Sequence, residues 1–396
     1  MVTKHFPYLI VGGGMTGDAA VRGIRKVDAD GVIGMFSLEN DPPYDRPPLS
    51  KGLWKGRPIE RIWRKTTDFG IDLHLGRRVI QITAAEKQVK DNLGNIFSYD
   101  KLLLATGASP IRLASAPPGV IFYRTVDDYR RLRALTDQGS RFAVIGGGFI
   151  GSELAASLII MNKEVSMIFA EDGIGEKVFP RPLSQQLNDF YRQKGVNVLA
   201  GRLVLGIEEK GSQYRLQLDN GQEIIVDGIA AGLGVRLNLE LAEQAGLAVD
   251  NGIIVDPYMR TSAADIYAAG DVISFYNPTL DRRMRVEHEE NANMTGTLAG
   301  LSMAGQPEPY NFLPSFDSKF FELGYEAVGE TQPDMELVED WNEPFPNGQG
   351  VIYYMKSNRV RGIVLWNIWQ KLKDARQVIA EPSPFKSEDL KGRIKA

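Results

Sequence analysis

Short apolar runs that end in a glycine-rich or acidic turn recur along the 396-residue chain. Residues 7–11 and 32–39 are typical of buried parallel strands, and the segment 15–27 between them is predicted to be a helix. Residues 101–110 and 265–272 are typical of two further buried strands, each with a glycine near its carboxyl end. Strands that alternate with helices favour a parallel sheet, so the pattern predicts an α/β fold.

The same order of elements begins again at residue 142. The segment FAVIGGGFIGSELA (142–155) predicts a strand, a glycine turn and the start of a helix, and VSMIFAED (165–172) predicts the next strand. The turn signal DNG at 219–221 and again at 250–252 predicts β-meanders within the two units. A helix rich in small residues is expected from 287 to 304. The repeated order predicts two Rossmann-like domains in one chain.

Two stretches depart from this pattern. Residues 40–54, NDPPYDRPPLSKGLW, contain four prolines, which exclude regular structure and predict an extended, stiff loop. Residues 350–366 predict two strands joined at 357–358, and a helix is expected over 370–380. The segment 306–396 is therefore expected to form a separate α+β domain.

The composition excludes several classes of function. The formal net charge of -4 gives no sign of nucleic-acid binding. The chain has no cysteine, which excludes disulfide frameworks, thiolate catalysis, iron–sulfur clusters and cysteine-bound zinc. The three histidines lie far apart in the sequence, so no metal site is expected. No apolar run approaches the length of about 18 residues that a membrane span needs, and we expect a cytoplasmic protein.

Gly12, Gly14 and Gly17 form a G-x-G-x-x-G motif between the first predicted strand and helix. In such a motif the first glycine makes a tight turn, the second lets the backbone approach a pyrophosphate, and the third brings helix and strand together. The N–H groups at the start of the helix then face the phosphates. Glu39 follows 22 residues after Gly17, where a carboxylate can accept from ribose hydroxyls. The motif predicts a dinucleotide site, and the alternative is a glycine-rich surface turn.

Gly146, Gly148 and Gly151 repeat the motif, and Glu171 stands 20 residues after Gly151. A carboxylate in that place accepts from a 2′-hydroxyl and repels a 2′-phosphate. No arginine lies between Glu171 and Lys177, so the sequence predicts NADH in preference to NADPH. Lys177 is either a ligand of the nucleotide or a solvated lysine.

Two dinucleotide sites in one chain indicate a flavoprotein, with FAD as the electron store and NADH as the hydride donor. The order of the motifs resembles that of the two-dinucleotide flavoproteins of glutathione-reductase-like fold, across essentially the whole chain. The redox-active cysteine pair of the disulfide-reducing members is absent. The resemblance implies an FAD-binding domain in two parts (1–112 and 236–305), an NAD-binding domain (113–235) and a C-terminal α+β domain (306–396).

Longer motifs resemble one branch of this fold. PYDRPPLSK (43–51) is similar to the flavin loop of oxygenase-coupled ferredoxin reductases and of the apoptosis-inducing factor family. The segments that resemble the latter family in particular are GGGFIGSELA (146–155), RVEHEENANMTGTLAG (285–300), GYEAVG (324–329) and GIVLWNIWQKLKDAR (362–376). The chain departs from that family in three ways. Phe316 replaces a frequent tryptophan, the insertion in the C-terminal domain is reduced to about residues 331–348, and the basic character linked to DNA binding is missing.

The resemblance gives a role to the glutamate that follows the third glycine of the second motif. In this family that acid points at the flavin edge and pairs with a lysine of the proline loop, which implies a catalytic pair of Glu153 and Lys51. A lysine at that edge stabilises negative charge, and its carboxylate partner holds it in place. The alternative is an ion pair on the surface.

Further cofactor-binding residues follow from the resemblance. For FAD it implies a phosphate contact from Arg46, an adenine-side path along Thr106 and Gly107, an adenine contact at Val79, a ribitol contact from Asp271, a helix start at Glu287 and His288 that faces the flavin, and an aromatic contact from Phe316. For NAD it implies that Glu326 holds the nicotinamide amide. The ordinary structural alternatives are a solvated arginine, a Gly-Asp turn, a structural histidine and a core phenylalanine.

Together these features predict an FAD-dependent NADH oxidoreductase, similar to apoptosis-inducing factor, that transfers hydride from NADH to flavin N5. The electron acceptor stays open between a quinone, a small carrier protein and oxygen. One alternative function is that of an NADH-dependent reductase of ferredoxin or rubredoxin. The other is a redox-sensing interaction protein with little turnover, in which reduction changes the formation of a homodimer.

Overall fold

The computed structural model describes residues 2–345, 348–382 and 384–395. The chain forms two compact units, which are described separately. Unit 1 comprises Met1–Arg46, Ile59–Ser109 and Arg236–Pro314, and unit 2 comprises Pro47–Pro58, Pro110–Val235 and Ser315–Ala396. The strands β7 (Ala108–Pro110) and β16 (Val235–Leu237) pair where the chain passes from one unit to the other. The functional domain limits expected at residues 112, 235 and 305 stay a prediction.

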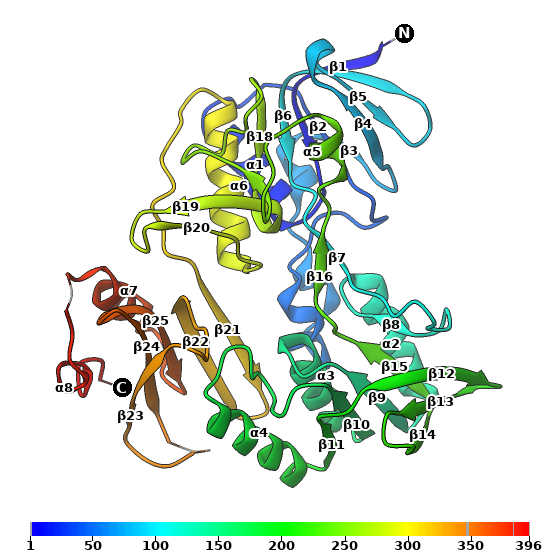
Figure 1. The fold of residues 1–396 in the computed structure, drawn as a ribbon. Coiled ribbons are helices and arrows are strands. Elements are labelled where there is room, and N and C mark those ends of the chain that lie inside the picture. The colour runs from blue at the N-terminus through cyan, green and yellow to red at the C-terminus, as the bar shows by residue number, and fades with distance from the viewer. Residues whose placement is uncertain (1, 346–347, 383, 396) are drawn as a thin grey trace. The chain divides into compact units, whose positions relative to one another are not determined.

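Unit 1 is built on a seven-stranded sheet in the order β3-β2-β1-β6-β5-β4, with β18 also paired to β6 (Figure 1). The pairs β1–β2, β2–β3, β1–β6 and β6–β18 are parallel, and the pairs β4–β5 and β5–β6 are antiparallel. The strands are β1 (Val2–Val11), β2 (Ile33–Phe36), β3 (Asp72–His74), β4 (Val79–Thr83), β5 (Gln88–Asp91), β6 (Ile96–Leu104) and β18 (Ile266–Ala268). A smaller sheet contains β17 (Ile253–Ile254), β19 (Ile273–Asn277) and β20 (Arg282–Met284).

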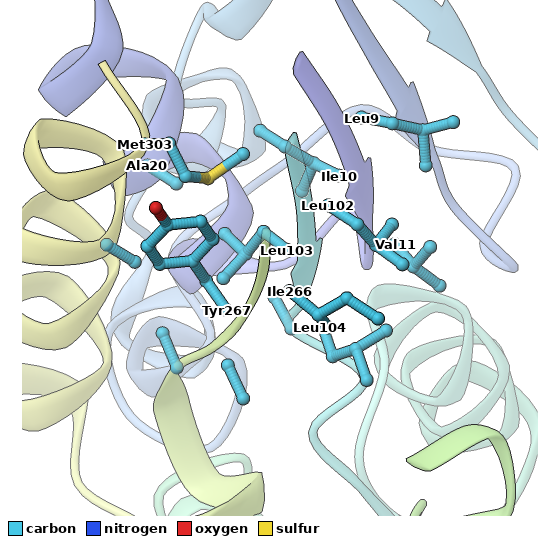
Figure 2. Close-up of a cluster of buried hydrophobic side chains, with 14 of the residues drawn as sticks. Leu9, Ile10, Val11, Ala20, Leu102, Leu103, Leu104, Ile266, Tyr267 and Met303 are labelled. Carbon is cyan, nitrogen blue, oxygen red and sulfur yellow. The ribbon is translucent and has the colours of Figure 1, made fainter. Parts of the chain in front are cut away.

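The helices of unit 1 pack closely because small residues line their contact. In α6 (Glu289–Met303), a Cβ on Gly296 would stand 2.4 Å from the carbonyl oxygen of Thr16 in α1 (Met15–Arg25). Figure 2 shows the core that results, in which Ala20 and Met303 lie near side chains of β1, β6 and β18. The remaining helices are α5 (Glu240–Gln244) and the 3-10 helices η3 (Ile59–Ile62), η4 (Thr66–Phe69), η5 (Ala84–Glu86) and η6 (Gly270–Val272).

Unit 2 contains a second parallel sheet, of five strands in the order β11-β10-β9-β15-β8, and an antiparallel sheet of β12, β13 and β14. The strands are β8 (Ile121–Phe122), β9 (Arg141–Ile145), β10 (Glu164–Phe169), β11 (Val196–Ala200), β12 (Val204–Lys210), β13 (Gln213–Leu218), β14 (Glu223–Val226) and β15 (Gly228–Ala231). The helices are α2 (Val126–Gln138), α3 (Phe149–Ile160), α4 (Arg181–Gln193) and the 3-10 helices η1 (Pro47–Leu49) and η2 (Gly52–Lys55).

The C-terminal part of unit 2 is an antiparallel sheet of five strands in the order β21-β22-β25-β24-β23 (Figure 1). Its central strands are buried along nearly their whole length, and α7 packs against β22 and β25. The elements are β21 (Ser315–Phe320), β22 (Leu323–Gly329), β23 (Glu336–Trp341), β24 (Gly350–Lys356), β25 (Arg359–Trp366), α7 (Leu372–Ala380) and α8 (Ser387–Leu390). The predicted pair of strands joined at 357–358 and the α+β character of this region are confirmed.

The predicted strands of unit 1 exist, but two of them are shorter than expected. The strand expected over 32–39 ends at Phe36, and the strand expected over 265–272 ends at Ala268. After Ala268 the chain cannot continue as a strand, because Gly270 takes a left-handed φ of 84° and begins η6.

Two turns also differ from the prediction. The proline loop is not wholly irregular, since it contains η1 and η2; the fixed φ of proline is compatible with the first turn of a helix. The turn at 219–221 joins β13 and β14 as predicted, whereas the turn at 250–252 closes only an isolated bridge between Val249 and Ile253.

Candidate functional site: two glycine turns and a buried ion pair

The first glycine turn joins β1 to α1 in unit 1. Gly12 has a φ of 129°, and a Cβ on it would stand 2.0 Å from the carbonyl oxygen of Ala105. A Cβ on Gly17 would stand 2.1 Å from the carbonyl oxygen of Gly12. Both positions therefore exclude any side chain. A Cβ on Gly14 would have no atom of the described residues within 4 Å, so the space beside the middle glycine is open.

The second glycine turn joins β9 to α3 in unit 2 and has the same construction. Gly146 has a φ of 120°, and its Cβ would stand 2.3 Å from the carbonyl oxygen of Gly232. A Cβ on Gly151 would stand 2.0 Å from the carbonyl oxygen of Gly146, and a Cβ on Gly148 would meet no described residue within 4 Å. The outer glycines are required by packing, and the middle one borders open space.

The helices after both turns begin without a side-chain cap. Gly14 precedes α1 and Gly148 precedes α3, and neither can offer a side-chain acceptor to the first N–H groups. An anionic pyrophosphate beside the middle glycine satisfies these donors and the positive end of the helix dipole. The residues of both turns therefore fit the phosphates of a dinucleotide.

The acids near the ends of β2 and β10 differ in how firmly they are held. Glu39 accepts hydrogen bonds from the Tyr44 hydroxyl and the Arg46 guanidinium, each at 2.5 Å. Glu171 lies 3.3 Å from Lys177, whose side chain is 86% exposed. Glu39 is therefore fixed by two neighbours, while the charged partner of Glu171 is largely in solvent.

The turn after β6 is fixed by an asparagine that the sequence did not indicate. The Thr106 hydroxyl donates to the Asn238 carbonyl, and the Asn238 amide donates to the Thr106 carbonyl, both at 2.8 Å. Gly107 has a left-handed φ of 59°. Val79 is buried in the core of unit 1, and its predicted contact with adenine stays a prediction.

The helix α6 begins next to several of the predicted flavin contacts in the sequence. His288 is its N-cap residue, and Glu287 pairs with Arg285 at 2.6 Å. Burial lowers the pKa of His288 to about 4; the Asp271 carboxylate opposes this shift and Arg285 adds to it. His288 is therefore uncharged at neutral pH, and the positive end of α6 arises from the backbone alone.

Glu153 lies at the centre of a buried polar cluster in unit 2. Its side chain is 5% exposed, and Lys51 Nζ lies 3.2 Å from Oε1. The Ser318 hydroxyl donates to the same oxygen and the Ser50 hydroxyl donates to Oε2, both at 2.6 Å. Lys51 also lies 3.3 Å from the half-exposed carboxylate of Asp317. Lys51 and Glu153 thus form a pair with fixed geometry, and their predicted place at the flavin stays a prediction.

The electrostatics of this cluster favour a charged lysine. Burial raises the pKa of Glu153 above its usual range, against the opposing effects of Lys51 and the two serine hydroxyls. Burial acts to lower the pKa of Lys51, but the carboxylates of Glu153 and Asp317 outweigh it and raise that pKa. Both pKa shifts keep a proton within the pair, so Lys51 retains its positive charge at neutral pH.

The backbone beside Lys51 is anchored within unit 2. The Leu49 carbonyl accepts from the Tyr123 hydroxyl at 2.6 Å and from Trp54 Nε1 at 2.7 Å. The Ser50 carbonyl accepts from the Ser157 hydroxyl of α3 at 2.8 Å. These bonds hold the segment before Lys51 against the helix that carries Glu153.

Comparison with known families agrees with this geometry. A family model described as pyridine nucleotide-disulphide oxidoreductase matches residues 6–296. The chain belongs to this family. A second model, described as the C-terminal part of mitochondrion-associated apoptosis-inducing factor, matches residues 331–381. Membership confirms the predicted two-dinucleotide fold and implies FAD and NAD(H) as cofactors of an oxidoreductase.

Individual members of the family match nearly the whole chain. Apoptosis-inducing factor 1 of Dictyostelium discoideum is 31% identical over 95% of this chain and 78% of its own length. The 5,5'-dehydrodivanillate O-demethylase ferredoxin reductase subunit of Sphingobium sp. is 37% identical over 90% of this chain and 89% of its own. Putidaredoxin reductase, solved in a covalent complex with putidaredoxin, matches with a TM-score of 0.89 and 28% identity over 98% of this chain and 95% of that chain.

An aromatic surface in unit 2 accompanies the second nucleotide turn of this family member. Phe149, the first residue of α3, is 39% exposed, and its ring lies 5.5 Å from that of Phe316. On β22, Glu326 accepts a hydrogen bond from the backbone of Gln370, and burial raises the pKa of Glu326. Its Oε2 is buried and accepts no hydrogen bond from the described residues. A carboxamide N–H is a suitable donor for that oxygen.

Several residues of the site were missed by the sequence analysis. Ser50 and Ser318 hold Glu153, Asp317 is a second partner of Lys51, and Tyr44 fixes Glu39. Serines and single tyrosines carry no spacing signal of their own. Only the position of Ser50 directly before Lys51 could have suggested one of them.

Metal and membrane features were searched among the described residues. Within 2–345, 348–382 and 384–395, no group of three or more histidine, aspartate or glutamate side chains could hold a metal ion. No helix in that part of the chain has the length and apolar character needed to cross a membrane.

Proposed function

We propose that this protein oxidises NADH and passes the hydride to the N5 atom of a bound FAD. The observation that carries the proposal is the presence of one open glycine cradle in each unit, at Gly14 and at Gly148. When bound, FAD supplies a hydride acceptor that can release electrons to a second partner.

Unit 1 is proposed to hold the FAD permanently. The N-terminus of α1 and the turn at Gly12–Gly17 bind the pyrophosphate, and Glu39 binds a ribose. Tyr44 and Arg46 orient Glu39 through short hydrogen bonds, which lowers the entropy lost on binding. The further FAD contacts that we propose are Lys51, Val79, Thr106, Gly107, Asp271, Glu287, His288 and Phe316.

Unit 2 is proposed to bind NADH reversibly. The turn at Gly146–Gly151 takes the pyrophosphate, and Glu171 accepts from the ribose of the adenosine half. Glu326 Oε2 accepts from the nicotinamide carboxamide, for which its unused acceptor capacity is suited. Lys177, which is strongly exposed, contributes weakly.

Lys51 and Glu153 are proposed to support hydride transfer. Lys51 supplies positive charge to balance the negative charge that hydride transfer delivers, and Glu153 fixes the position of Lys51. Ser50 and Ser318 hold both oxygens of Glu153, so the carboxylate cannot rotate away from the lysine. The chain needs no acid–base residue for this step.

Two candidates have support as the electron acceptor. A small electron-carrier protein is supported by the likeness to ferredoxin reductases over nine-tenths of the chain. A redox-sensing role, with a reduction-dependent homodimer, is supported by the apoptosis-inducing-factor match at 331–381. The cytoplasmic location stays a prediction.

The test is an anaerobic titration of the purified protein with NADH. We expect the visible flavin absorbance to bleach, NADPH to act more slowly, and heat denaturation to release free FAD. Absence of bleaching would overturn the proposal. A panel of ferredoxin, rubredoxin, quinone and oxygen then separates the acceptors, and light scattering with and without NADH tests the homodimer.

A further inference from the structure

The loop that follows β10 connects the predicted nucleotide site to the C-terminal sheet. This nucleotide loop, residues 171–179, carries both Glu171 and Lys177. A role for its anchors rests on the proposed function, because it concerns the affinity of the same site for NADH. These anchors lie in a region that the glycine motifs do not cover.

One side of the nucleotide loop is tied to the second glycine turn and to α4. The backbone N–H of Gly175 donates to the carbonyl of Gly147 at 2.9 Å. The side chain of Asn188 donates to the Asp172 carbonyl at 2.8 Å and accepts from the Ile174 N–H at 3.1 Å. The position of the loop is therefore coupled to the turn that is proposed to hold the pyrophosphate.

The other end of the nucleotide loop is tied to the C-terminal sheet. The hydroxyl of Tyr354, on β24, donates to the carbonyl of Val178. The side chain of Phe179 is 2% exposed and meets the rings of Tyr325 and Trp366 edge-on, at centroid distances of 4.8 and 5.6 Å. Tyr325 and Trp366 are paired across β22 and β25 and stack with an interplanar angle of 3°.

These contacts form a firm anchor. Burial raises the pKa of the Tyr354 phenol well above its usual value, so the hydroxyl stays protonated and acts as a donor. Gly175 has a φ of 72°, and a Cβ on it would stand 2.6 Å from the Phe179 ring, so the loop needs a glycine to bring this ring into the sheet. A buried carbonyl that loses its donor is costly, and the loop would shift to find another.

We propose that Tyr354 and Phe179 are positioning residues for NADH, through which the C-terminal sheet sets the affinity for the adenosine half of the nucleotide. They act through the nucleotide loop, by holding Glu171 where it can accept from the ribose. The sheet thereby contributes to nucleotide affinity and selectivity at a distance from the ribose itself.

The experiment uses the full-length holoprotein with the variant Tyr354→Phe, which removes the donor and keeps the ring. The Kd of ADP-ribose, measured by calorimetry, is expected to rise about 5-fold to 20-fold, and the KM for NADH is expected to rise with it. The rate of flavin reduction at saturating NADH should stay within about 2-fold of wild type, because the loop acts only on binding. The preference for NADH over NADPH should narrow.

The neighbouring residue provides a matched control. Tyr353 is equally buried, but it lies on the other face of the strand, near Asp340 and Ile394. Tyr353→Phe removes a hydroxyl from the same strand and should leave the Kd of ADP-ribose unchanged. An equal rise in Kd for both variants, or no rise for Tyr354→Phe, would overturn the inference.

A second variant keeps the test decisive if Tyr354→Phe folds poorly. Phe179→Leu removes the edge-on ring contacts and is expected to raise the Kd of ADP-ribose in the same way. An unchanged Kd with this variant would also overturn the inference. If NADH does not reduce the wild-type flavin at all, the proposed function fails instead, and the two failures are thereby distinguished.

Discussion

The two glycine turns share one backbone design, yet the side chains around them differ. In each turn the outer glycines are closed in by carbonyl oxygens, and the middle glycine borders open space. The acid beyond the first turn, Glu39, is held by Tyr44 and Arg46 at 2.5 Å each. The acid beyond the second, Glu171, is paired with the exposed Lys177 at 3.3 Å.

A second difference concerns a buried acid in each helix that follows. Asp18 in α1 is fully buried and is bound by the guanidinium groups of Arg22 and Arg64, at 2.8 and 2.7 Å. Glu153 in α3 is bound by one lysine and two serine hydroxyls. Two arginines fully neutralise Asp18, which suits a structural role, whereas the single lysine beside Glu153 keeps charge available for chemistry.

The difference fits the two uses proposed for the turns. A cofactor that stays bound gains from a preorganised acid, because little entropy is lost when the ligand orders the site. A substrate that must leave after each turnover is better served by an acid with an exposed partner. The comparison therefore predicts retention in unit 1 and exchange in unit 2.

The largest effect is expected from Lys51 and Glu153. Lys51→Ala, Glu153→Ala and the double variant should each lower the rate of flavin reduction about 10²-fold to 10³-fold, and the losses should be strongly non-additive, because either single change leaves the other charge stranded. Stopped-flow reduction by NADH measures the three rates. As a control, Asp18→Asn should lower the unfolding temperature while the reduction rate stays near wild type. Additive losses for Lys51 and Glu153 would show that they act separately.

The next effect concerns His288 and the pH dependence of stability. The pKa of His288 is lowered to about 4 in the folded protein, so its stabilising contribution is complete above pH 6.5 and is lost as the pH falls toward 4. The loss amounts to about 3 kcal/mol. Urea unfolding at a series of pH values should show a steeper acid loss for wild type than for His288→Gln. Glu153, with its raised pKa, acts in the opposite sense, since its contribution falls as the pH rises through its folded pKa.

Nucleotide selectivity should change by a smaller factor. Wild type is expected to prefer NADH over NADPH by about 10-fold to 100-fold in kcat/KM, and Glu171→Ala should narrow that gap. Arg202 follows Gly201, whose N–H donates to the Glu171 carbonyl, so an arginine stands near this acid after all. Arg202→Ala in the Glu171→Ala background should lower NADPH use again. Equal use of both nucleotides by wild type would contradict the role of Glu171.

The smallest effect is expected from Lys177. Its pairing with Glu171 is exposed and screened by solvent, so Lys177→Ala should change the KM for NADH by no more than about 3-fold. The corresponding change in unit 1, Arg46→Ala, should release FAD during dialysis, because it removes a fixed partner of Glu39. If the Lys177 variant lost NADH binding as severely as Arg46→Ala loses FAD, the contrast between a closed and an open site would be wrong.

Local features were the most predictable part of the molecule. Apolar runs predicted the strands of both parallel sheets, and small residues predicted the close helix α6, since these depend on neighbours in sequence. The ends of β2 and β18 were placed too late, because hydrogen bonds from other segments and the left-handed φ of Gly270 decide where pairing stops. The predicted pairing of Lys51 with Glu153 came from a resemblance and is present in unit 2.

The sequence by itself determined the two nucleotide turns, because a G-x-G-x-x-G motif encodes its own steric requirement within a few residues. It also determined the absence of thiol chemistry. Only the tertiary structure decided which side chains hold those of the site. Ser50 and Ser318 reach Glu153 from 103 and 165 residues away, and Tyr354 reaches Val178 from a distance of 176 residues. Serine and tyrosine hydroxyls bind whichever acceptor packing brings near, so no local pattern specifies their partners.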